Sequence, residues 1–162
     1  MIIMGIDPGV ARVGWAIIST AKSSPKAIAY GCIETKQSDG HGNRLLAAYK
    51  AIASLLSRYK PDCVSMEELF FSKNVKTAIA VGEGRGVLLL ASAKNKTPVI
   101  SYSPSRVKQT VCGDGRADKP QIQRMVKRIL RLKDIPKPDD AADALAIALT
   151  HAYSYKMKGA LI

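Results

Sequence analysis

The sequence predicts an α/β fold: a single domain built on a five-stranded mixed β-sheet flanked by α-helices. Three observations support this expectation. The first third of the chain holds three short apolar runs separated by turn residues. The remainder alternates apolar runs with segments of helical period. The 162 residues, 47% of them hydrophobic, are enough to bury one core but few for two domains. We therefore expect residues 1–162 to form one domain.

The first three predicted strands span Ile2–Asp7, Val13–Ser19 and Ala27–Glu34. A sharp turn is expected at Asp7-Pro8-Gly9, because proline fixes φ and glycine accepts a positive φ. A polar loop, Lys36–Asn43, then leads into a helix that ends near Tyr59. The apolar positions of this helix keep the 3.6-residue period: Leu45, Leu46, Tyr49, Ile52, Ala53, Leu56 and Tyr59.

Strands and helices alternate in the rest of the chain. Pro61-Asp62 stops the first helix, and a fourth strand follows to about Glu67. The remaining predicted elements are a helix over Val75–Lys94, a strand over Thr97–Tyr102, a short helix from Ser103 to about Val111, a helix that begins near Lys119-Pro120, and a last helix over Asp139–Tyr153. Pro120 suits an early helical position, where its missing N–H costs nothing.

Four acidic residues stand where a metal site is assembled in such folds. Asp7 and Glu67 each end an apolar strand, and we expect these two strands to lie side by side at the sheet centre. Asp140 and Asp143 are three apart, so they share one face of the last helix, which should pack across those strands. A carboxylate on so apolar a helix must be paired or metal-bound. The two histidines lie outside this set, so an all-oxygen site for Mg²⁺ or Mn²⁺ is expected.

The charge of the chain indicates a polyanionic partner. Lys and Arg number 25 against 13 acidic residues, a net charge of +12. Residues 105–137 alone carry ten basic residues and three acidic ones. An ordinary basic protein is the alternative, but such clustering favours nucleic acid. Phosphodiester chemistry with two metal ions, ~3.5–4 Å apart, would fit both the acids and the charge.

Other features bound the setting of the protein. Cys32, Cys63 and Cys112 are odd in number and far apart, which favours reduced, mostly buried thiols over a disulfide frame or zinc site. No apolar run is long enough for a membrane span, and the N-terminus lacks a signal-peptide pattern. We expect a soluble cytoplasmic protein with no membrane partner.

Four motifs, in order over nearly the whole chain, resemble the RuvC-type Holliday-junction resolvases of the RNase H-like nuclease superfamily. They are Gly5-Ile6-Asp7-Pro8-Gly9, Met66-Glu67-Glu68-Leu69-Phe70 with Lys73-Asn74, Val107-Lys108-Gln109-Thr110-Val111 with the segment to Lys119, and Asp140-Ala141-Ala142-Asp143-Ala144-Leu145-Ala146. The resemblance implies an RNase H-like fold and a Mg²⁺-dependent crossover junction endodeoxyribonuclease. It further implies paired symmetric nicks in four-way DNA junctions, made by a homodimer that cooperates with a branch-migration motor during recombination and repair.

The resemblance also assigns residues. It implies that Asp7, Glu67, Asp140 and Asp143 are catalytic ligands of two Mg²⁺ ions, for which Mn²⁺ would substitute, and that Lys108 and Lys119 lie beside the scissile phosphate. DNA contacts are expected from Phe70, Lys73, Arg85, Lys108, Arg116 and Lys119. Phe70 would stack on bases at the opened crossover. From the residues alone, Phe70-Phe71 could equally anchor a loop in the core, and we expect Phe70 to be the exposed ring.

Some alternatives stay open from the sequence. An RNase H-like nuclease for another substrate, such as a ribosomal-RNA precursor, would share the acids. A DNA-binding protein without catalysis would need a damaged acid set, and all four acids are present. An actin-like ATPase needs two such domains, more than this length allows. Gly82-Glu83-Gly84-Arg85-Gly86 does not have the spacing of a dinucleotide fingerprint. Because glycines weaken a helix, these glycines indicate close approach to DNA or to a partner helix. The part played by Arg85 is open.

Overall fold

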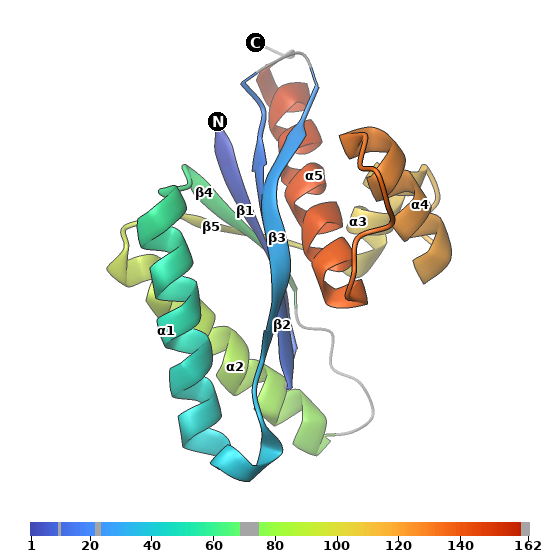
Figure 1. The fold of residues 1–162 in the computed structure, drawn as a ribbon. Helices are drawn as coiled ribbons and strands as arrows, with labels where there is room; N and C mark the ends of the chain where they lie inside the picture. Colours follow the sequence, from blue (N-terminus) through green and yellow to red (C-terminus); the bar gives the residue numbers. More distant parts are fainter. Residues whose placement is uncertain (10, 22–23, 69–74, 160–162) are drawn as a thin grey trace.

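A five-stranded mixed sheet forms the centre of the molecule, as predicted. The computed structural model describes residues 1–9, 11–21, 24–68 and 75–159. The strands are β1 (Ile2–Pro8), β2 (Arg12–Ser19), β3 (Lys26–Glu34), β4 (Cys63–Glu67) and β5 (Val99–Tyr102), in the spatial order β3-β2-β1-β4-β5 (Figure 1). The antiparallel pairs β1–β2 and β2–β3 form a meander, and β4 and β5 add in parallel beside β1.

The two acid-bearing strands are neighbours at the sheet centre, which confirms the predicted arrangement. β1 and β4 run parallel, with Ile6 opposite Met66 in their register. The next residue of each strand is the acid, Asp7 or Glu67. Because the strands are parallel, both acids leave the sheet at the same edge.

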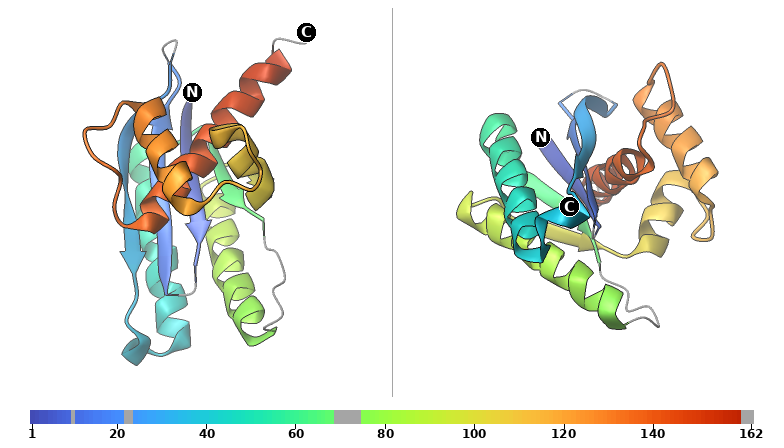
Figure 2. Two further views of the ribbon diagram at one scale, coloured as in Figure 1. Left: turned by 90° about the vertical axis from the view of Figure 1, so that its right-hand side faces the viewer. Right: turned by 60° about the horizontal axis from the view of Figure 1, so that its bottom comes forward.

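Helices cover both faces of the sheet (Figure 2). One face carries α1 (His41–Tyr59) and α2 (Val75–Lys94), and the other carries α5 (Asp139–Gly159) with α3 (Pro104–Cys112) and α4 (Lys119–Leu130) outside it. Each face has its own apolar core. Ile17, Ile52 and Leu88 belong to the core under α1 and α2, and Ile3 and Leu145 to the core under α5. In the described part of the chain, no helix is long and apolar enough to cross a membrane.

The first helix differs from the prediction at its start. α1 begins at His41, inside the expected loop, after a short 3-10 helix over Gln37–Asp39. The residues of α1 that are buried are Ala48, Ile52 and Leu56, which are spaced by four residues and form one line along the helix. Leu46 lies off this line and is 48% exposed, so the expectation that it belongs to the apolar face is wrong.

The last helix packs across the central strands, as expected, and continues to Gly159 rather than ending near Tyr153. Two glycines of the sheet allow this close packing. A Cβ at Gly5 would collide with the Ala144 carbonyl, and a Cβ at Gly14 would collide with the Asp140 carbonyl. Glycine at these two positions therefore lets α5 approach the sheet closely, which places its first turn beside Asp7.

The turn after β1 also needs glycine, for a reason other than the predicted one. Gly9 is not among the residues with positive φ. A Cβ at Gly9 would collide with the Arg12 carbonyl across the turn. Glycine is therefore required there because a side chain would collide with the neighbouring carbonyl, and not because φ is positive.

Candidate active site

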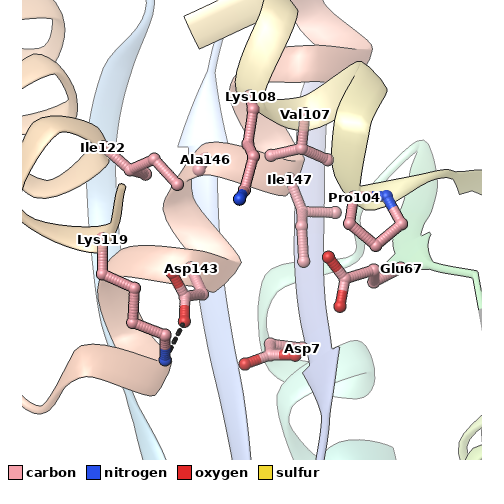
Figure 3. Close-up of a pocket in the computed structure, with 10 residues that line it drawn as sticks. All are labelled: Asp7, Glu67, Pro104, Val107, Lys108, Lys119, Ile122, Asp143, Ala146 and Ile147. Atoms are coloured by element: carbon pink, nitrogen blue, oxygen red, sulfur yellow. Dashed lines mark hydrogen bonds and ion pairs between the residues drawn. The ribbon is translucent and has the colours of Figure 1, made fainter. Parts of the chain in front are cut away.

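A pocket of about 260 Å³ opens where the ends of β1 and β4 meet α3, α4 and α5. Its polar side chains are Asp7, Glu67, Asp143, Lys108 and Lys119, five of the six residues predicted to be catalytic. Figure 3 shows Asp143 and Lys119 on one side of the hollow, Glu67 on the other, Asp7 below and Lys108 above. Apolar side chains complete the lining: Pro104, Val107, Ile122, Ala146 and Ile147. The pocket thus places three carboxylates and two ammonium groups against a largely apolar wall.

The carboxylates interact strongly because they are crowded and largely withdrawn from water. Burial, followed by the charges of Asp143, Glu67 and Asp140, raises the pKa of Asp7 from 3.8 to about 7, against a lowering effect of Lys119. Burial, then the charge of Asp143, also raises the pKa of Glu67, although Lys119 and Lys108 lower it. A cation placed among these groups would relieve both the burial and the repulsion.

Lys119 is fixed beside the acids by the start of α4. Asp118 caps this helix in a capping box with Gln121, so the first turn, which includes Lys119, is well defined. The Lys119 Nζ donates to Asp143 Oδ2 at 3.3 Å. The negative charge of Asp143 accordingly raises the pKa of Lys119, which keeps it a cation. Lys119 is therefore a fixed positive charge at the pocket rim, with its side chain 67% exposed.

Asp140 faces a neighbouring groove rather than the pocket. The Asp140 Oδ2 atom is 3.9 Å from an Arg12 guanidinium nitrogen and 3.9 Å from the Cys32 Sγ. Arg12 also pairs with Glu34 on β3, at 3.3 Å. The expectation that Asp140 and Asp143 point together is therefore met only in part: their charges act on each other, but their side chains line different hollows.

The donor set suits Mg²⁺ or Mn²⁺ in its chemistry. The potential metal ligands of the pocket are carboxylate oxygens, which Mg²⁺ and Mn²⁺ favour over nitrogen or sulfur. In the part of the chain that the structure describes, no three Asp, Glu, His or Cys side chains lie close enough to hold one ion as they stand. Holding an ion therefore requires these carboxylates to turn toward one another within the pocket.

Of the predicted DNA contacts, Lys108 and Lys119 line the pocket, and the other four divide into three groups. Phe70 and Lys73 fall outside the described residues. Arg116 is exposed in the loop before α4. Arg85 is turned inward: its guanidinium donates to the Glu67 carbonyl oxygen at 3.3 Å and to the Ser101 Oγ at 2.7 Å. Arg85 therefore connects α2 to the ends of β4 and β5, and it supports the backbone that carries Glu67.

The glycines around Arg85 have different surroundings. A Cβ at Gly84 would lie 3.8 Å from the Gly9 carbonyl oxygen, so this part of α2 passes close to the turn after β1. Gly86 faces open space, with nothing within 4 Å of a Cβ placed there. The expected close approach is thus internal at Gly84, and at Gly86 the helix is open to a neighbour.

Sequence reasoning missed Arg12 and Cys32, which surround Asp140. A strand-end arginine opposite a glutamate could have been found from the β2–β3 register, which pairs Arg12 with Glu34. Nothing in the sequence signalled Cys32, whose thiol pKa is raised to about 11 by burial and by the charge of Asp140. The three cysteines are free, as predicted, but only Cys63 is fully buried.

Comparison with known proteins gives consistent matches over the length of the chain. The sequence model of the family described as crossover junction endodeoxyribonuclease RuvC matches residues 3–151. A protein of that description from Clostridioides difficile is 53% identical over 161 residues, which cover 99% of this chain and 95% of that protein. The structure of Thermus thermophilus RuvC is 34% identical with a TM-score of 0.90, covering 98% of this chain and 97% of that one. T. thermophilus RuvC in complex with a Holliday junction substrate is 32% identical with a TM-score of 0.89, covering 97% and 96%.

Proposed function

The chain belongs to the RuvC family of crossover junction endodeoxyribonucleases, and from this membership we propose that it resolves four-way (Holliday) DNA junctions by paired symmetric nicks. The observation that carries the proposal is the pocket that gathers Asp7, Glu67 and Asp143 with Lys108 and Lys119. Carboxylates for metal ions and ammonium groups for phosphate are the groups that phosphodiester hydrolysis requires. The reaction serves homologous recombination and DNA repair.

Asp7, Glu67, Asp140 and Asp143 would hold two divalent ions, Mg²⁺ by preference, with Mn²⁺ as a substitute. When bound, such ions stabilise the charge on the phosphate and lower the pKa of a coordinated water. The chain itself supplies the setting. Asp7 suits this role, because its pKa of about 7 reflects first its burial and then repulsion by the neighbouring acids, both of which a cation would relieve. For Asp140 to join this set, its side chain would have to leave the 3.9 Å contact with Arg12 and turn from the groove toward the pocket.

The two lysines orient the scissile phosphate. Lys119 is held by Asp143 at the rim, and Lys108 lies above the hollow (Figure 3). Ammonium groups on two sides neutralise the phosphate and favour the added negative charge of the transition state. The apolar wall of Val107, Ile122 and Ile147 limits water around the reacting group, which strengthens these interactions.

A homodimer follows from the need to cut two equivalent strands, since a two-fold dimer presents two identical sites. α2 offers a surface for it. Ile79, Glu83, Gly86 and Leu90 recur at helical spacing on its outer face, and Ile79 and Leu90 are 57% and 55% exposed. Exposed apolar residues around an open glycine suit close contact between two copies of one helix. The predicted branch-migration motor would act on the same junction. The free cysteines are in keeping with a cytoplasmic location.

The test compares three substrates of matched sequence: a four-way junction, a linear duplex and an RNA–DNA hybrid. Each is incubated with the protein at ~10 mM Mg²⁺, a level suited to a carboxylate site that keeps several waters, and again with chelator. We expect symmetric nicks in the junction alone, abolished by chelator. Cutting of the hybrid instead would assign the chain to another RNase H-like activity. Junction binding without cutting in Mg²⁺ or Mn²⁺ would leave it a binding protein.

A further inference from the structure

A second, more open hollow adjoins the pocket on the side of Asp140. This groove, of about 570 Å³, is lined by Arg12, Lys119, Lys137, Pro138, Asp139 and Asp140. Lys119 lines both the groove and the pocket. The two hollows therefore adjoin at this lysine, so a strand whose phosphate lies beside Lys119 in the pocket passes next to the groove.

The groove carries more cations than acids, and both of its acids contact neighbouring side chains. The side chains of Arg12 and Lys119 are 53% and 67% exposed, whereas that of Asp140 is 27% exposed beside Arg12. Asp139 Oδ1 accepts a hydrogen bond from the Gln123 side chain at 2.9 Å. Asp139 is itself exposed, so the groove presents three cations and two carboxylates and keeps a net positive charge.

Lys137 is the least engaged of these cations. It is exposed, and within the described ranges no carboxylate lies at ion-pair distance from it. Lys133, four residues earlier in the same loop, is also exposed but does not line the groove. The ammonium group of Lys137 can therefore bind an anion without first breaking an ion pair.

The spacing of DNA phosphates makes the groove a second subsite for the strand being cut. Successive phosphates of one strand advance by about 3.4 Å of helix axis, so neighbours of a phosphate held at Lys108 and Lys119 lie within reach of the adjoining groove. We propose that Lys137 binds a backbone phosphate next to the scissile one, with Arg12 bordering the same subsite. This inference rests on the proposed function, since it takes the pocket as the place of the scissile phosphate.

The experiment combines one protein change with one DNA change. Lys137→Ala is compared with Lys133→Ala and with the charge-preserving Lys137→Arg. Each protein is given junctions in which a single phosphate, scanned over both sides of the cut, is replaced by an uncharged methylphosphonate. Binding is measured over a series of salt concentrations, and single-turnover cutting is measured at ~10 mM Mg²⁺.

We expect Lys137→Ala to weaken junction binding several-fold. The slope of log binding constant against log salt concentration should become shallower by about 0.9 for each phosphate that is no longer neutralised. Lys137→Arg should restore both, and Lys133→Ala should change neither. At one phosphate beside the cut, the methylphosphonate should weaken binding by wild type and by Lys133→Ala but should weaken binding by Lys137→Ala little further.

The inference would be overturned if Lys137→Ala bound the junction as tightly as wild type does. It would also be overturned if the loss of binding caused by Lys137→Ala and the loss caused by the methylphosphonate were independent, and so multiplied, at every scanned phosphate. The binding arm does not depend on cutting. If wild type bound but did not cut the unmodified junction, the proposed function would fail while the subsite was still decided by binding.

Discussion

Replacing Asp7 by asparagine should make the metal-free protein more stable while removing its activity. The physical reason is the charge that Asp7 must carry in a crowded, buried position. Its pKa is about 7 in the folded protein against an ordinary 3.8. The folded state therefore binds this proton more tightly than the unfolded state. The stability contributed by protonated Asp7 is complete below about pH 4 and is lost as the pH rises to about 7.

The size of the effect follows from that shift. The difference of about three pKa units corresponds to a ceiling of about 4 kcal/mol at pH 8, at ~1.36 kcal/mol per unit. Water entry and rotation of the carboxylates relax part of such a penalty. We therefore expect Asp7→Asn to raise the free energy of unfolding by about 1–3 kcal/mol at pH 8, or the melting temperature by roughly 3–9 °C for a chain of this size.

The assay is urea unfolding in chelator at pH 5 and pH 8, with Asp134→Asn as the control because Asp134 is exposed in the loop after α4. The gain of Asp7→Asn over wild type should be larger at pH 8 than at pH 5, and Asp134→Asn should show no such gain. Added Mg²⁺ should stabilise wild type more than Asp7→Asn, because a ligand that binds only the folded state shifts unfolding. If Asp7→Asn unfolded at the same or a lower urea concentration than wild type at pH 8, the charge of Asp7 would not destabilise the metal-free fold.

Three further predictions test other parts of the structure. Gly14→Ala places a methyl group against the Asp140 carbonyl, so it should cost about 1–3 kcal/mol in urea unfolding and slow cutting; Gly42→Ala, whose Cβ would meet nothing within 4 Å, is the control. Lys119→Ala removes the ammonium group that contacts Asp143, so single-turnover cutting should fall about 10²–10³-fold. Junction binding should change far less, and equal losses in both would contradict a role in the transition state. Leu90→Lys places a charge on the outer face of α2, where we propose that two copies meet, so sedimentation should show monomers. Leu46→Lys, the control at a comparably exposed leucine of α1, should remain dimeric. A dimeric Leu90→Lys protein would show that α2 is not the interface.

Most of the fold could be predicted from the pattern of apolar residues along each strand and helix. Apolar runs that end in Asp7 and Glu67 predicted two buried strands, and the structure places them side by side in parallel. The period of α1 predicted that Ile52 and Leu56 lie on its apolar side, and both are buried. These features are local, because they depend on which side of an element is apolar, and the sequence states that directly.

The sequence was less informative where two distant elements meet. The spacing of Asp140 and Asp143 gives a shared helix face, but only the packing partner decides that Asp140 contacts Arg12 while Asp143 contacts Lys119. The same holds for Gly14, whose need for glycine comes from a carbonyl 126 positions later in the chain, at Asp140. The inward turn of Arg85, on α2, depends on Ser101 in β5. No periodicity within one segment reports such contacts.

Metal-dependent cutting of a four-way junction should require the acids around the pocket. To test this, single-turnover cutting of a labelled junction by wild type and Asp7→Asn is followed at the same bound fraction, over a titration of Mg²⁺. Wild type should nick two symmetry-related positions at a rate that rises with Mg²⁺ and saturates, and Asp7→Asn should bind the junction but leave it uncut. Cutting by Asp7→Asn at the wild-type rate, or wild-type cutting that persists in chelator, would contradict the claim.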